Sequence, residues 1–128
     1  MAASSNLLVQ YVVVRGDLLK TLKWPVGAVI AQACHATTAV IHSFQNDPNV
    51  LSYTSDLDRM HKVVLEAPDE TSLWTLSEAL TAASIDYKLW VEQPENFPTC
   101  LATKPYKKED IQTYFKRDRC QPSVDNTQ

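Results

Sequence analysis

Residues 7–14, LLVQYVVV, are almost all apolar and rich in β-branched side chains. A strand covered on one face alternates apolar and polar residues, whereas a nearly continuous apolar run is typical of a strand covered on both faces. Such a strand needs a layer of other elements on each side, and 128 residues suffice for one domain of this kind. The sequence therefore predicts a single domain over residues 7–119, with a flexible N-terminus at 1–6 and a flexible tail at 120–128.

A second long segment, WPVGAVIAQACHATTAVIHSF at residues 24–44, predicts a helix over about residues 26–45. Advancing 100° per residue from Gln32 places the apolar side chains between roughly 60° and 200°. Gln32, His35 and His42 fall on a narrow edge between roughly −80° and 0°. We expect this polar edge to face solvent, and the apolar face, which includes Ile30 and Cys34, to be buried.

The rest of the chain predicts an alternation of strands and helices. Strands are expected at residues 60–67, 85–92 and 99–105, and helices at 68–84 and 107–117. In the strand at 85–92, Lys88, Trp90 and Glu92 alternate with apolar residues and therefore share a face. The order of elements implies an α/β fold, a layered domain with a small mixed sheet flanked by helices.

Composition excludes several classes of protein. With only two glycines the chain has no glycine-rich phosphate loop, so dinucleotide and P-loop folds are not expected. Cys34, Cys100 and Cys120 are widely spaced and form no ligand pattern with histidine, so we expect neither a metal site nor a disulfide framework. No apolar run is long enough to cross a membrane, and the N-terminus does not resemble a secretory signal. Free thiols fit a reducing compartment, and we expect a cytoplasmic protein.

Charge is distributed unevenly along the chain. The formal net charge is -3, but residues 104–119 carry six basic and three acidic side chains. This segment could contact phosphates, although a solvated helix face is the favoured interpretation.

Three segments resemble the peptidyl-tRNA hydrolase 2 family of archaea and eukaryotes. They are the first strand with its ending, YVVVRGDLL, the helix start GAVIAQACHA, and the strand with its following acidic helix start, KVVLEAPDETSLWTLSEAL. Within that family, the Trp-Pro before the helix and the segments VVLEAPDET and LWVEQPEN are similar to the subgroup called peptidyl-tRNA hydrolase domain-containing protein 1. The order and spacing of the predicted elements agree with the family over about residues 8–103.

The resemblance implies a four-stranded mixed sheet flanked by helices, often in a homodimer. It implies hydrolysis of the ester that joins a peptide to the 3′ ribose of tRNA, with peptidyl-tRNA as the partner and with no metal or organic cofactor. Gln32 and His35 match catalytic positions of the family. Glu92 stands near the family aspartate, and Asn96, which lacks a hydroxyl, stands near its Ala-Gly-x-Thr segment. The tRNA-binding positions that we assign beside them are Arg15, Asp17, Lys20 and Lys23.

The predicted site suits ester hydrolysis, which needs an activated water and donors for the tetrahedral oxyanion. A positioned base contributes on the order of 10²–10⁴-fold, and His35 is the best candidate because an unperturbed imidazole has a pKa near 6.5. Glu92 could polarise a water, while Gln32 and Asn96 could donate to the oxyanion. We do not expect Cys34 to act as a nucleophile, because it falls on the predicted buried face.

Position 28 also departs from the family pattern. The family lysine lies four residues before the glutamine, where this chain has Ala28, and side chains at i and i+4 are neighbours on a helix. Alanine cannot hold a phosphate or an oxyanion as an ammonium does. Two alternatives therefore stay open: a tRNA- or protein-binding module that has kept the fold and lost hydrolysis, and a small-molecule binder that uses the same cleft.

Overall fold

The computed structural model describes residues 7–116 and 121–122. Its sheet has four long strands in the order β3-β4-β1-β2, and they are β1 (Leu8–Arg15), β2 (Lys62–Ala67), β3 (Tyr87–Glu92) and β4 (Phe97–Thr103). β1 and β2 are parallel and the other pairs are antiparallel. The predicted mixed four-stranded sheet is therefore confirmed.

Two strands of two residues extend this sheet. β5 (Tyr106–Lys107) pairs with β1, and β6 (Gln121–Pro122) pairs with β2. β6 falls within the segment predicted as a tail. The rest of that tail, and the N-terminal segment 1–6, lie outside the described residues.

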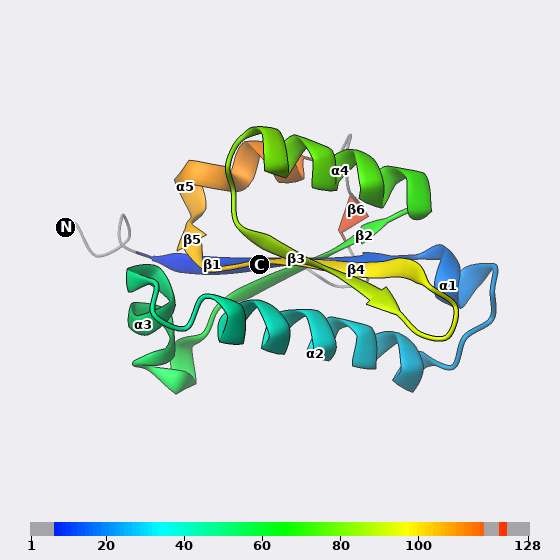
Figure 1. The fold of residues 1–128 in the computed structure, drawn as a ribbon, viewed down its shortest axis with the longest axis horizontal. Helices are drawn as coiled ribbons and strands as arrows, with labels where there is room; N and C mark the ends of the chain where they lie inside the picture. The colour runs from blue at the N-terminus through cyan, green and yellow to red at the C-terminus, as the bar shows by residue number, and fades with distance from the viewer. Residues whose placement is uncertain (1–6, 117–120, 123–128) are drawn as a thin grey trace.

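Helices cover both faces of the sheet (Figure 1). α2 (Val26–Ser43) and α3 (Pro48–Thr54) lie on one side, and α4 (Glu70–Ala82) and α5 (Lys108–Ile111) on the other. The predicted helix 107–117 is instead α5 followed by a 3-10 helix, Gln112–Phe115, and a second 3-10 helix spans Leu57–Arg59. α1 (Asp17–Lys20) is not predicted from the sequence, because four residues are too few to show a helical period.

β1 is buried on both faces, as its composition predicts. Val9 and Val13 belong to the core cluster that α4 covers, and Val12 belongs to the cluster beneath α2. Gln10 is also fully buried, and its amide is paired: Nε2 donates to the Thr103 carbonyl at 3.0 Å, and Oε1 accepts from Lys62 Nζ at 2.6 Å. A polar residue fits inside this strand because both polar atoms of its side chain have a hydrogen-bond partner.

The predicted buried face of α2 is wrong in part. Gln32, Ala36 and Val40 are buried, and spacings of four residues place them on one face of the helix. Cys34 is exposed and Ile30 is 58% exposed, so the helix is rotated from the predicted orientation and Gln32 faces the sheet. The reason is a partner on β4: Thr99 Oγ1 donates to Gln32 Oε1 at 2.7 Å, which allows the amide to be buried.

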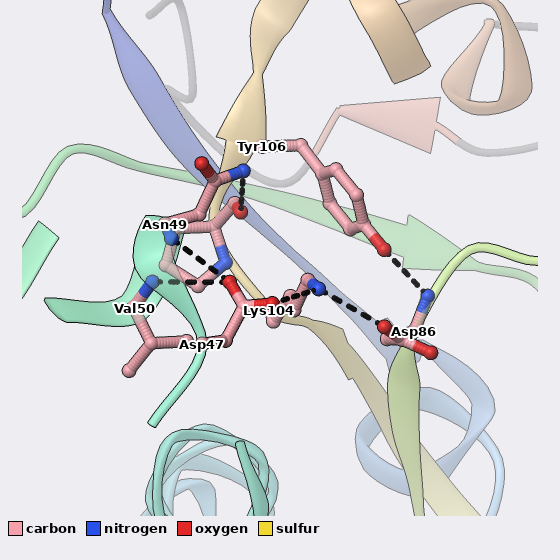
Figure 2. Close-up of polar contacts among 7 residues, drawn as sticks. Asp47, Asn49, Val50, Asp86, Lys104 and Tyr106 are labelled. Carbon is pink, nitrogen blue, oxygen red and sulfur yellow. Dashed lines mark hydrogen bonds and ion pairs between the residues drawn. The ribbon is translucent and has the colours of Figure 1, made fainter. Parts of the chain in front are cut away.

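Lys104 belongs to a buried ion-pair network rather than to a basic surface (Figure 2). Its Nζ lies 2.6 Å from Asp47 Oδ1 and 3.0 Å from Asp86 Oδ2, above the rings of Phe44 and Tyr106. Asp47 also caps α3 by accepting from the backbone N–H groups of residues 49 and 50. The network therefore joins the start of α3 to the end of β4 and the start of β3.

The network makes stability depend on pH. Although burial would raise the pKa of the Asp47 carboxyl, its hydrogen bonds with Lys104 and with the backbone hold that pKa below 3.8. The stabilisation is therefore complete above pH 3.8 and is lost as the pH falls further. Asp47→Asn retains a capping side chain but removes the charge, and we expect it to lower the free energy of unfolding at pH 7 by about 1.5–3 kcal/mol.

Urea denaturation of the full chain between pH 2.5 and 7 measures this effect. The wild-type free energy of unfolding should fall more steeply than that of Asp47→Asn below pH 3.8. Asp56→Asn is the matched control, because the Asp56 carboxylate lies in an exposed pair with Arg59 at 3.7 Å. Equal pH profiles for wild type and Asp47→Asn would contradict the role assigned to the carboxylate.

Candidate active site

Gln32 is 2% exposed and both polar atoms of its side chain are bonded. Nε2 donates to the Ala28 carbonyl at 3.2 Å, one turn earlier in α2, and Oε1 accepts from the Thr99 hydroxyl. The expectation that this side chain faces solvent is therefore wrong. An amide nitrogen carries two N–H bonds, and the contact with Ala28 uses one of them. Gln32 is a rigidly oriented amide at the boundary between α2 and β4.

His35 contacts the third strand through Trp90. The two rings stack with centroids 4.7 Å apart and an interplanar angle of 25°. Trp90 Nε1 in turn donates to Glu92 Oε1 at 2.8 Å. The indole therefore links the exposed imidazole on α2 to the carboxylate at the end of β3. The sequence predicts that His35 and Glu92 belong to one site, and in the structure Trp90 contacts both of them.

Asn96 lies in the turn that joins β3 to β4, with a φ of 60°. Asparagine tolerates this left-handed conformation better than most residues. Its backbone N–H donates to the Glu92 carbonyl at 2.6 Å, and its Oδ1 accepts from Gln93 Nε2 at 3.0 Å. The peptide bond between Gln93 and Pro94 is cis. Asn96 therefore has a structural role in closing the turn next to Glu92.

The turn and the start of α2 lie at the same end of the molecule (Figure 1). Trp24, just before the helix, approaches Phe97 at the start of β4 with ring centroids 6.1 Å apart. The site is thus formed by one helix and one hairpin. A sequence model of the family peptidyl-tRNA hydrolase PTH2 matches the chain over residues 8–118. The chain belongs to this family.

Two relatives are similar in sequence to this chain over most of its length. Both are named "Putative peptidyl-tRNA hydrolase PTRHD1", one from Homo sapiens and one from Mus musculus. The human protein is 51% identical over 123 residues, which cover 93% of this chain and 88% of the relative. The mouse protein is 51% identical over 115 residues, which cover 89% and 82%.

Arg15 and Asp17, assigned to substrate binding from the resemblance to PTH2 proteins, form a pair with each other. Arg15 Nε and Nη2 donate to the two carboxylate oxygens of Asp17, each at 2.9 Å. Arg15 Nη1 donates to the Pro98 carbonyl at 3.0 Å, and the guanidinium lies 4.9 Å from the centre of the Phe97 ring. Arg15 is 5% exposed, so this arrangement joins the end of β1 to the hairpin and leaves little of its charge for a ligand.

Lys20 and Lys23 lie in the segment between β1 and α2, and both are exposed. Lys20 Nζ forms an ion pair with Glu66 Oε2 on β2 at 2.5 Å. β1 separates β2 from β4 in the sheet, so this contact holds Lys20 away from the Gln32–Thr99 bond. Lys23 has a φ of 61° in the turn before Trp24. In this structure Lys20 therefore places no ammonium beside the Gln32–Thr99 bond.

Within the described residues, no three histidine, cysteine or acidic side chains are grouped as metal ligands, and no helix is long and apolar enough to cross a membrane.

Trp90 and Thr99 are the two site residues that sequence reasoning missed. Strand alternation places Trp90 beside Glu92, but no local pattern indicates that His35 stacks on it. The role of Thr99 depends on its pairing with a residue 67 positions away.

Proposed function

We propose that this PTH2 protein hydrolyses the ester between a peptide and the 3′ end of tRNA, and that the reaction occurs between α2 and the β3–β4 turn. The observation that supports it most strongly is the His35–Trp90–Glu92 chain of contacts, which brings an imidazole and a carboxylate to one place. Membership of the family and the names of the two relatives support the same reaction.

His35 and Glu92 together provide what activation of a water requires. The exposed imidazole can accept a proton from water as the oxygen attacks the ester carbonyl. Only one oxygen of Glu92 is needed for the Trp90 indole, so the other can accept a hydrogen bond from the water or from the imidazolium. Proton transfer from His35 to the 3′ oxygen of the ribose then completes the cleavage.

Amide groups provide the donors for the oxyanion. Gln32 is held on both sides, by the Ala28 carbonyl and by the Thr99 hydroxyl, so its second N–H has a fixed direction. A donor that is oriented before the reaction stabilises developing charge without reorganisation. Asn96 Nδ2, in the turn beside Glu92, is the second candidate donor. The ammonium that the family pattern supplies at position 28 is missing from this set.

Binding of the tRNA backbone requires cations near the site, because phosphates dominate the affinity of proteins for nucleic acids. Lys23 is exposed just before the start of α2, so we assign a phosphate contact to it, whereas Lys20 is paired with Glu66. The proposal includes a cytoplasmic location, because translation produces peptidyl-tRNA there.

The proposal is tested by incubating the purified full chain with peptidyl-tRNA and measuring released peptide and free tRNA. We expect release above the rate in buffer, because at least one base and one oxyanion donor are present. Binding to the same tRNA is measured in parallel by a gel-shift titration. Tight binding without release would overturn the enzymatic proposal and favour a non-catalytic tRNA-binding module.

A further inference from the structure

An apolar groove lies next to the candidate active site, on the opposite side of α2. Its walls come from α1, the first turns of α2, β1 and β2, and its volume is about 550 Å³. Pockets for small ligands usually have about 300–1,000 Å³. We name it the Ile30 groove, after the residue at its rim, and its apolar lining includes Val14, Leu19, Val26, Val29, Ile30 and Val64.

The rim of the Ile30 groove exposes large apolar side chains to water. Val26 is 60% exposed, Ile30 is 58% exposed and Leu19 is 45% exposed, although the helical pattern predicts burial of Ile30. Contiguous exposed apolar surface on a folded domain marks a binding site more often than scattered single residues do. The rotation of α2 that buries Gln32 is what turns Ile30 toward this groove.

The charged groups at the Ile30 groove neutralise one another. Lys20 is paired with Glu66, and Arg15 is paired with Asp17. Glu66 also packs closely against Gly16, where an added Cβ would lie 1.7 Å from its Oε2 atom. A phosphate or a charged side chain would have to break one of these pairs. The groove therefore favours an uncharged, apolar occupant.

The position of the Ile30 groove relates it to the ester. Arg15 lines the groove and also binds the Pro98 carbonyl, next to the Thr99 residue that holds Gln32. The groove, lined by β1 and β2, and the His35–Trp90 contact on β3 lie on opposite flanks of α2, so a path between them spans at least one helix diameter, about 10–12 Å. An extended peptide advances about 3.3 Å per residue, so about three residues would cross that distance.

We propose that the Ile30 groove binds an apolar side chain of the peptide portion of the substrate, about three residues before the ester. This inference rests on the proposed function. Peptidyl-tRNAs with apolar residues at that distance are therefore hydrolysed in preference to those with polar residues.

The test compares two substrates with the same ester, N-acetyl-Leu-Leu-Leu-Gly-tRNA and N-acetyl-Ser-Ser-Ser-Gly-tRNA. We expect kcat/KM to be at least tenfold higher for the leucine substrate, mainly through KM. Ile30→Ser should abolish most of this preference and leave the serine substrate unchanged. Leu51→Ser is the matched control, because Leu51 is 55% exposed on α3 and lies outside the groove. Hydrolysis without a preference, or a preference that survives Ile30→Ser, would overturn the inference.

A binding measurement separates failure of the groove from failure of the reaction. The free amides of the two peptides are titrated against the full chain, and the methyl NMR signals of Val26 and Ile30 are followed. If neither tRNA is hydrolysed but the leucine amide alone shifts these signals, the proposed function fails and the groove inference stands. If neither amide shifts them, the inference is wrong. Sedimentation of wild type and Ile30→Ser identifies a competing occupant, since a dimer that dissociates on substitution would assign the groove to a second copy.

Discussion

His35→Ala is expected to slow the release of peptide from peptidyl-tRNA by at least tenfold, which corresponds to about 1.4 kcal/mol of transition-state stabilisation. A general base contributes about 10²–10⁴-fold, and His35 is the imidazole that stacks on Trp90 beside Glu92. The effect should appear in kcat more than in KM, because proton transfer belongs to the transition state.

The matched control for this substitution is His42→Ala. His42 lies seven residues further along α2, is exposed and belongs to the same edge, but the ring contact with Trp90 is made by His35. Each variant removes one imidazole from α2, so a difference between their rates of peptide release reports the position of His35 in the site. Equal rates for wild type and His35→Ala would remove His35 from the mechanism, even if the protein is active.

Glu92→Gln tests the same mechanism from the other side of the indole. Glutamine can still accept the hydrogen bond of Trp90 Nε1, so packing of the hairpin should be preserved while the charge is lost. We expect a decrease of at least tenfold, and a combined effect with His35→Ala smaller than the product of the two. Glu95→Gln, exposed in the same turn, should leave the rate unchanged. Independent effects of the two substitutions would show that the residues do not act on one water.

Much of the fold follows from local patterns in the sequence. The continuous apolar run at 7–14 predicts a strand with both faces covered, and β1 is buried beneath helices on both sides. Asp69 accepts from the Ser72 N–H at 2.9 Å at the start of α4, as the acidic helix start indicates. The apolar run and the helix cap can both be recognised from residues that are close in sequence.

The orientation of α2 could not be predicted in the same way. The angular positions of the side chains identify an apolar face. They assign Gln32 to solvent, because burial of an amide without a hydrogen bond is unfavourable. That hydrogen bond comes from Thr99, which the β3–β4 hairpin brings beneath the helix. Strand alternation likewise places Trp90 and Glu92 on one face, yet only the tertiary structure decides that α2 covers that face. The sequence therefore predicts the elements that would carry the candidate site, α2 and the β3–β4 hairpin, whereas the contacts within it depend on the tertiary structure.

Ala28→Lys is expected to raise the rate of peptide release by at least tenfold, and by no more than the roughly 10²–10³-fold that one oxyanion donor contributes. Ala28 is half-buried in the first turn of α2, and its carbonyl accepts from Gln32 Nε2. A lysine at that position projects beside the Gln32 amide, where it can neutralise an oxyanion or a terminal phosphate. The cost is a cation at a helix N-terminus, which should destabilise the fold by about 0.3–1 kcal/mol.

Gly27→Lys is the control that decides between local and general effects of the added charge. An added Cβ at Gly27 has no neighbour within 4 Å, so the substitution fits, and it adds the same charge about 100° around the helix. A cation that only attracts tRNA should lower KM equally at positions 27 and 28. A cation that stabilises the oxyanion should raise kcat at position 28 alone, because the stabilisation requires contact with one atom. Equal gains in both variants would therefore refute the idea that an ammonium at position 28 acts on the chemical step, and would leave Gln32 and Asn96 as the candidate oxyanion donors.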